Sequence, residues 1–83
     1  MSMNKELIVT QVTSTLVEIL DKKDIVITPA TRLADLGVDQ LDRFELVIRC
    51  EDLFEVEISD EQAEKFMTIE DIATFVEMQR SAL

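Results

Sequence analysis

The chain has 83 residues, 18 of them acidic and 8 basic, and it carries a net charge of −10 with a pI of about 4.2. This length is enough for one small domain, and a hydrophobic content of 47% favours a folded chain over a disordered one. The acidity argues against nucleic acid or an anionic membrane as a partner, and the lack of histidine excludes imidazole catalysis and an ordinary zinc site.

The first predicted element is a helix that begins after Ser2 or Asn4, since either residue can act as an N-cap, and that ends near residues 21–24. The residues expected on its buried face recur at helical spacing: Leu7, Ile8, Val12, Leu16, Ile19 and Leu20. No apolar run in the sequence approaches the roughly 20 residues that cross a bilayer, so we expect no stable membrane insertion.

A long loop is predicted over residues 25–39. Thr28 precedes a proline and starts a turn, and Gly37 supplies a positive φ. Leu33 and Leu36 are expected to anchor this loop on the core. Because loops of this length are uncommon in small domains and are often functional, the segment is a candidate for part of a site.

A second helix is predicted over Gln40–Phe54, with Asp39 as its N-cap. Asp39 with Arg43, and Glu45 with Arg49, have the i,i+4 spacing of ion pairs on a helix surface. The apolar residues that we expect to face the core repeat with a period near 3.6: Leu41, Phe44, Val47, Ile48 and Phe54.

Two capping boxes follow. Ser59 with Gln62 opens a short helix that runs through Lys65, and Thr68 with Asp71 opens the last helix. The residues expected inward on the last helix are Ile69, Ile72, Ala73 and Val76.

The one stretch with strand-like alternation, residues 55–58, has no partner strand in the sequence. The predicted fold class is therefore all-α, a small bundle of three main helices and one short helix with a long loop between the first two. We expect residues 1–83 to form a single domain.

The negative charge is concentrated in the middle of the chain. Residues 35–64 hold eleven acidic side chains against two arginines, Arg43 and Arg49. One interpretation is a hydrated face that keeps the protein soluble. The other is a docking surface that attracts a basic partner.

Residues 35–47 read Asp-Leu-Gly-Val-Asp-Gln-Leu-Asp-Arg-Phe-Glu-Leu-Val. This stretch resembles the signature of the freestanding acyl carrier proteins, which is roughly D-L-G-x-D-S-L-D-x-x-E-L-V. The downstream residues, the chain length, the acidity and the long first loop are also similar to that family, so the resemblance covers essentially the whole chain.

The resemblance implies a helical carrier that is not an enzyme. In that family a serine at the start of the second helix receives 4′-phosphopantetheine from coenzyme A, and the thiol of this arm carries acyl groups. Gln40 stands at the position of the serine, and its amide has no hydroxyl oxygen that could attack phosphorus. None of residues 35–45 is serine or threonine, so we expect this sequence to carry no cofactor.

The resemblance also implies that basic partner enzymes dock on the second helix. The residues that match the family's docking positions are Asp39, Leu41, Asp42, Glu45, Glu51 and Asp52. Other attachment sites are weak, because Ser59 is expected to cap a helix and Cys50 to be a buried apolar residue whose acidic neighbours raise its pKa. No EF-hand spacing is present, so no dedicated metal site is predicted.

Three functions remain open on this reading. The first is a non-catalytic, carrier-like protein that docks enzymes of fatty-acid, polyketide or lipid synthesis, of the phosphopantetheinyl transferase, acyltransferase or ketosynthase types, but cannot take the arm. The second is an ordinary acyl carrier, in which Gln40 replaces a natural serine or the arm is attached unconventionally. The third is an acidic helical adaptor unrelated to acyl transfer. In each case we expect a cytoplasmic monomer that binds no nucleic acid.

Overall fold

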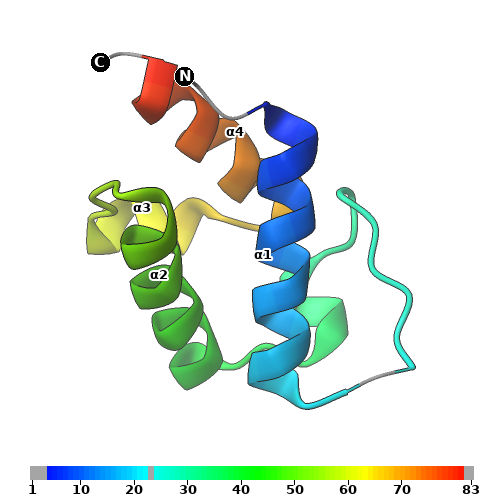
Figure 1. Cartoon of the computed structure of the whole chain (residues 1–83). Coiled ribbons are helices and arrows are strands. Elements are labelled where there is room, and N and C mark those ends of the chain that lie inside the picture. Colours follow the sequence, from blue (N-terminus) through cyan, green and yellow to red (C-terminus); the bar gives the residue numbers. More distant parts are fainter. Residues whose placement is uncertain (1–3, 23, 82–83) are drawn as a thin grey trace.

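Four α-helices and one short 3-10 helix make up the fold in the computed structural model, which describes residues 4–22 and 24–81 (Figure 1). In chain order the elements are α1 (Lys5–Leu20), the 3-10 helix η1 (Leu33–Leu36), α2 (Gln40–Phe54), α3 (Asp60–Lys65) and α4 (Ile69–Ser81). The predicted all-α class is confirmed, with three main helices, one short helix and a long connection before α2. Within the described ranges there is no strand, and a single bridge joins Arg32 to Thr68.

The first two predicted helix starts are confirmed by their capping bonds. Asn4 Oδ1 accepts a hydrogen bond from the backbone N–H of Leu7 at 2.8 Å. Asp39 Oδ1 accepts from the N–H of Asp42 at 2.8 Å, and Asp42 Oδ2 accepts from the N–H of Asp39 at 3.3 Å. These bonds satisfy donors that a helix N-terminus leaves without partners. Ser2, the other candidate cap of α1, lies outside the described residues.

Both later helices have the predicted N-caps, and of the two predicted capping boxes the one at Thr68 and Asp71 shows both reciprocal bonds, whereas Ser59 and Gln62 show one of the two among the described residues. Ser59 Oγ accepts from the N–H of Gln62 at 3.1 Å at the start of α3. Thr68 Oγ1 accepts from the N–H of Asp71 at 3.1 Å, while Asp71 Oδ2 accepts from the N–H of Thr68 at 3.1 Å. Short polar side chains therefore set where both helices begin.

Three helical segments end on a residue in the left-handed backbone region. Gly37 follows η1 with φ 80°, as predicted for the glycine of this loop. Asp21 ends α1 with φ 52°, and Glu55 ends α2 with φ 56°. Glycine adopts this region without a steric penalty, whereas the two acidic residues adopt it at a cost.

The long connection between α1 and α2 is fastened to the far end of the chain. The N–H of Leu33 donates to the carbonyl of Met67 at 2.9 Å, and the N–H of Glu70 donates to the carbonyl of Pro29 at 2.9 Å. Leu33 is fully buried and Leu36 is partly buried against the core, which confirms their predicted anchoring role. The connection is thereby held beside the start of α4, and it delivers the chain to the first residue of α2.

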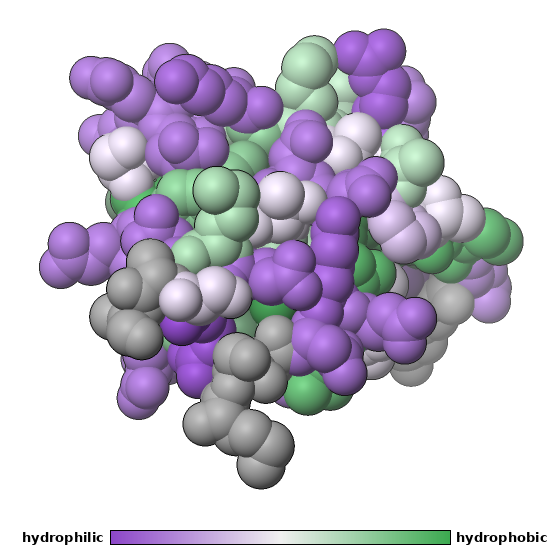
Figure 2. Space-filling model, turned by 90° about the horizontal axis from the view of Figure 1, so that it is seen from above, coloured by the Kyte–Doolittle hydropathy of each residue, from purple (hydrophilic) through white to green (hydrophobic). Residues whose placement is uncertain are grey.

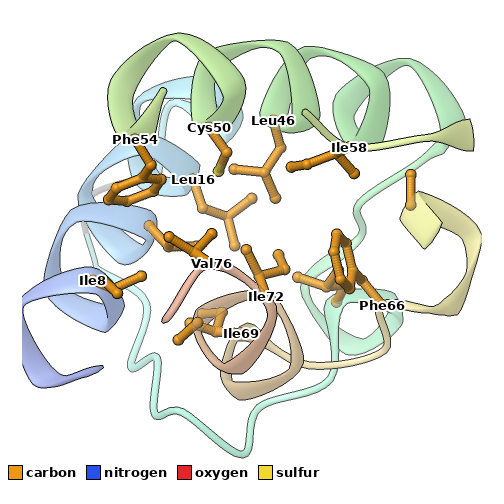
Figure 3. Close-up of a cluster of buried hydrophobic side chains, with 14 residues drawn as sticks. Ile8, Leu16, Leu46, Cys50, Phe54, Ile58, Phe66, Ile69, Ile72 and Val76 are labelled. Carbon is orange, nitrogen blue, oxygen red and sulfur yellow. The ribbon is translucent and has the colours of Figure 1, made fainter. Parts of the chain in front are cut away.

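The core lies where α1 packs against α2 and α4, with side chains from α3 and the connecting segments closing it (Figures 1 and 3). Its largest buried side chains are Ile8, Val12, Leu16, Leu33, Leu46, Phe54, Ile69, Ile72 and Val76. Burial of each such side chain stabilises the fold by roughly 1.5–3 kcal/mol. One expected core residue of α1 was wrong: Leu7 is 44% exposed, on the flank of the buried face.

The predicted inward face of α2 requires a larger correction. Leu41, Phe44 and Ile48 are exposed by 78%, 61% and 47%. A different row faces the core, with Leu46, Cys50 and Phe54 directed towards Leu16 and Val76 (Figure 3). Both rows recur at helical spacing, so periodicity alone does not say which of them meets α1. Of the residues predicted inward on α2, only Val47 and Phe54 pack into or against the core.

Candidate functional site

The start of α2 carries Gln40, which stands at the position where the resemblance implies an attachment serine. Gln40 is the first residue of the helix and is exposed to solvent. It follows Asp39, whose carboxylate is engaged with the N–H of Asp42 in the capping box. The helix terminus thus presents a carboxamide with no side-chain hydroxyl beside it on either sequence neighbour.

The predicted docking residues fall into two groups on α2. Leu41, Glu45 and Asp52 are exposed and lie on one side of the helix at i, i+4 and i+11 spacing. Glu45 Oε2 also forms an ion pair with Arg49 Nη2 at 3.1 Å, as the i,i+4 spacing predicts. This group forms an exposed strip along α2 that begins with an apolar residue and continues with two acidic ones.

The remaining predicted docking residues are engaged within the fold. Asp39 and Asp42 belong to the capping box, and Asp42 is half-buried. Glu51 is also half-buried, and its Oε2 accepts from the N–H of Ile58 at 2.9 Å, which fastens the turn that leads into α3. These three carboxylates accept hydrogen bonds from backbone N–H groups as well as contributing negative charge.

The exposed apolar residues of α2 line up along the helix. Leu41, Phe44 and Ile48 follow one another at i, i+3 and i+7, so they form a continuous row on its outer side. The end of the molecule shown in Figure 2, seen from above Figure 1, is mostly hydrophilic, and its hydrophobic residues lie in separate areas. A row of large apolar side chains rimmed by carboxylates is typical of a surface that binds a protein partner.

A groove of about 330 Å³ runs between α2 and α3. Its apolar lining comes from Phe44, Val47, Ile48, Ile58 and Ala63. Gln40 lies at its edge, together with Arg43 and the acidic residues Glu51, Asp60 and Glu64. The volume falls at the small end of the range of about 300–1,000 Å³ that ligand pockets occupy.

The hydrogen-bond partners of Arg43 are not the ones that its sequence neighbours suggest. The predicted ion pair with Asp39 is absent among the described residues. Instead, Arg43 Nη1 donates to the carbonyls of Ala63 at 2.9 Å and Phe66 at 2.6 Å, at the end of α3. A cation at a helix C-terminus is favourable because the last carbonyls lack partners and carry partial negative charge. Arg43 therefore fastens α3 to α2 across one end of the groove.

Cys50 offers no alternative attachment point. It is 1% exposed in the core, as predicted, and burial raises the pKa of its thiol to about 12. The cause is desolvation in the core and not the acidic neighbours that the sequence suggests. A buried, protonated thiol is a poor nucleophile. Over residues 4–22 and 24–81, no cluster of side chains suited to holding a metal ion occurs, and no helix has the length and apolar character to span a bilayer.

Comparison with known proteins identifies the fold and the signature. Residues 10–76 match the family model described as the phosphopantetheine attachment site. The solution structure of a protein assigned as an acyl carrier protein from Anaplasma phagocytophilum is similar, with 34% identity and a TM-score of 0.81 over 94% of this chain and 93% of that one. A protein assigned as an acyl carrier protein from Mycobacterium tuberculosis shares 34% identity with a TM-score of 0.74, over 81% and 90%. A mitochondrial acyl carrier protein of Toxoplasma shares 28% with a TM-score of 0.68, over 87% and 93%.

Proposed function

Because this chain belongs to the acyl carrier protein family, we propose that it is a non-catalytic carrier-fold protein that binds carrier-dependent enzymes through α2 without carrying the phosphopantetheine arm. Its partners would be enzymes of fatty-acid, polyketide or lipid synthesis with basic surfaces, such as phosphopantetheinyl transferases, acyltransferases and ketosynthases. The observation that carries this proposal is that Gln40 is exposed at the start of α2, on a helix whose Leu41, Glu45 and Asp52 are also exposed.

The attachment site does not fit the cofactor that the family implies. Attachment needs an oxygen nucleophile at the start of α2, and Gln40 presents a neutral amide whose nitrogen lone pair is delocalised. Residues 35–45 contain no serine or threonine, and the Cys50 thiol is inaccessible.

The docking part of the proposal rests on the surface of α2. Leu41 is the most exposed apolar residue of the helix, and the exposed Glu45 and Asp52 follow it along the same side, one and three turns away. Carboxylates beside an apolar residue steer a basic partner and then bury a hydrophobic contact. The opposite side of α2 is held in the core by its buried residues, Leu46, Cys50 and Phe54.

Attachment is tested by incubating the folded chain with coenzyme A and a promiscuous phosphopantetheinyl transferase, followed by intact mass measurement. We expect no change in mass for the chain with Gln40 and the addition of one phosphopantetheine for Gln40→Ser. Addition to the chain with Gln40 would overturn the loss of attachment. A folded Gln40→Ser protein that stays unmodified would overturn the proposed docking to this transferase.

Docking is tested by competition with a loaded acyl carrier protein for its ketosynthase. The natural chain should inhibit, and Glu45→Gln with Asp52→Asn should weaken inhibition by about tenfold through the loss of two steering charges. The matched control is Glu6→Gln with Glu18→Gln, which removes two exposed carboxylates from α1. Equal effects of the two pairs would mean that only net charge matters, and would contradict a docking site on α2.

The family match also supports a second candidate, an ordinary acyl carrier whose natural residue at position 40 is serine. The intact mass of the protein isolated from its host separates the two: a mass equal to this sequence supports the first, and a serine at position 40 with an attached arm supports the second. A cytoplasmic location stays a prediction, and one structural relative is mitochondrial.

A further inference from the structure

A second groove lies between α3 and α4 and has a volume of about 540 Å³. The residues of α4 in its lining share one side of that helix, since they are spaced i, i+3, i+4 and i+7: Asp71, Thr74, Phe75 and Met78. A different side of α4 packs into the core, through Ile69, Ile72, Ala73 and Val76. The helix therefore has a second side that is open to a ligand along about two turns.

The apolar part of the α3–α4 groove is exposed and adaptable. Met67 and Met78, which both line it, are exposed by 54% and 66%. Phe75 is half-buried, and its ring meets the almost fully buried ring of Phe66 edge-on, with the ring centroids 5.6 Å apart. The aromatic pair is fixed by this contact, whereas unbranched methionine side chains reshape easily around a partner. Such a surface suits the apolar face of a helix.

The charge of this groove differs from that of α2. Asp71 is engaged within the fold, because its Oδ2 accepts hydrogen bonds from the N–H groups of Met67 at 3.0 Å and Thr68 at 3.1 Å. Lys65 is exposed, and it forms no ion pair with any residue in the described ranges. The charge left without a partner in the lining is therefore a cation. The other polar residues of the lining are neutral: Gln62, Thr74 and Gln79.

We propose that the α3–α4 groove binds an amphipathic helix of a partner protein, whose carboxylate pairs with Lys65 and whose apolar residues lie on Phe75 and Met78. Apolar residues three or four positions apart on such a helix are separated by about 4.5–6 Å along its axis, which matches the spacing on the open side of α4. The carboxylate supplies the partner that Lys65 lacks. No residue of α2 lines this groove, and it selects an acidic group where α2 selects basic ones, so the inference goes beyond the docking function proposed above.

Other occupants fit the groove less well. A second copy of this chain carries the same net charge of −10, so the two molecules repel each other. A basic helix brings its cation against Lys65. A free aliphatic carboxylate pairs with Lys65 but leaves Thr74 and Gln79 without a polar partner. A helix with a single carboxylate matches the length, the apolar surface and the charge of the lining together.

The test uses the chain alone and two synthetic alanine-based peptides of about 20 residues, a length that forms a helix in water. Both carry leucine at i, i+3 and i+7, and they differ only in one residue, glutamate or glutamine, placed one turn from the leucines. Binding is followed by NMR shifts of the Phe75 and Met78 amides. We expect the glutamate peptide to bind about threefold more tightly, as one exposed ion pair provides. Lys65→Met should remove this difference. The matched control, Lys22→Met, removes one exposed positive charge outside the groove lining and should keep it.

The apolar contact has its own pair of variants. Met78→Ser should weaken binding of the glutamate peptide about fivefold, because it removes apolar surface that the peptide buries. Val26→Ser changes a residue of the long connection that is 87% exposed and lies outside the groove lining, and it should leave binding unchanged.

Four outcomes would overturn the proposal. They are no binding, equal binding of the two peptides to the unsubstituted chain, equal effects of Lys65→Met and Lys22→Met, and displacement of the peptide by an equal concentration of octanoate. Self-association of the unsubstituted chain that Met78→Ser abolishes would assign the groove to a second copy and would overturn it as well. Because no carrier-dependent enzyme takes part, the result is independent of the ketosynthase competition.

Discussion

Replacement of Arg43 by methionine should destabilise the protein far more than the same change at Arg49. Met keeps most of the aliphatic stem and removes the guanidinium, so the carbonyl of Phe66 loses its donor at 2.6 Å. The carbonyl of Ala63 loses a donor at 2.9 Å but still accepts from the N–H of Phe66 at 3.3 Å. Hydrogen bonds from charged donors contribute about 1.5–3 kcal/mol each, and here one nitrogen serves two partly exposed bonds, so we expect a loss of about 2 kcal/mol.

Arg49→Met is the matched control on the same helix. Arg49 forms an exposed i,i+4 pair with Glu45, which is worth only about 0.3–0.5 kcal/mol. Urea unfolding followed by circular dichroism measures both variants, and a loss of 2 kcal/mol corresponds to a fall of about 10 °C in Tm for a domain of this size.

Amide hydrogen exchange shows which part of the chain loses stability in Arg43→Met. Arg43→Met should speed exchange at the amides of α3, Asp60–Lys65, because the tie between α3 and α2 is removed. Losses within about 0.5 kcal/mol of each other in the two variants, with unchanged exchange in α3, would refute the role that we assign to Arg43.

Three further predictions follow from single features. Burial raises the pKa of the Cys50 thiol from 9.0 to about 12, so its contribution to stability is fully present below pH 9 and is lost as the pH rises from 9 towards 12. The free energy of unfolding of the unsubstituted chain should therefore fall more steeply with pH in that window than that of Cys50→Ala. Gly37→Ala should cost about 1 kcal/mol in thermal unfolding through its positive φ alone, since an added Cβ would meet only the Lys22 Nζ at 3.9 Å; no loss would contradict the left-handed backbone there. Millimolar Mg²⁺ should raise the Tm by screening the repulsion among 18 acidic side chains, and a Tm indifferent to both Mg²⁺ and NaCl would exclude that repulsion as a source of instability.

Helix boundaries were predictable because they depend on neighbours in sequence. Asp39 and Thr68 cap helices with partners three residues ahead, and Gly37 marks the end of a turn by its own backbone freedom. The second helix was predicted at its observed bounds for this reason. Such signals are local, so a single sequence contains them in full.

The orientation of α2 was not predictable in the same way. Its sequence has two apolar rows, one through Leu46 and Cys50 and one through Phe44 and Ile48, and only packing against α1 decides which is buried. The prediction placed Leu41, Phe44 and Ile48 inward and also expected Cys50 to be buried, whereas the fold buries only the second of these rows. When a helix has apolar residues on two sides, one side packs into the core and the other stays exposed, where it is available to a partner.

The partner of Arg43 was hidden for a different reason. Its hydrogen-bond acceptors are backbone carbonyls 20 and 23 residues away, and every residue type has a carbonyl. Arg80 does the same at the end of α2, where its guanidinium donates to the carbonyl of Phe54. The sequence suggested Asp39, four positions away, as the partner of Arg43. In the fold the carbonyls at the end of α3 accept its hydrogen bonds instead. Arginines of this kind are found only when the helix ends are placed in space.

The left-handed ends of α1 and α2 make the protein easier to engineer than its small core suggests. Asp21 and Glu55 are exposed and lie outside the row of apolar residues on α2 and outside the groove. Glycine at either position removes the strain of a side chain in this region, which amounts to about 1 kcal/mol per residue. A background with both changes would supply the reserve of stability in which damaging variants of the docking helix still fold, so that their effects on binding are measured on intact protein.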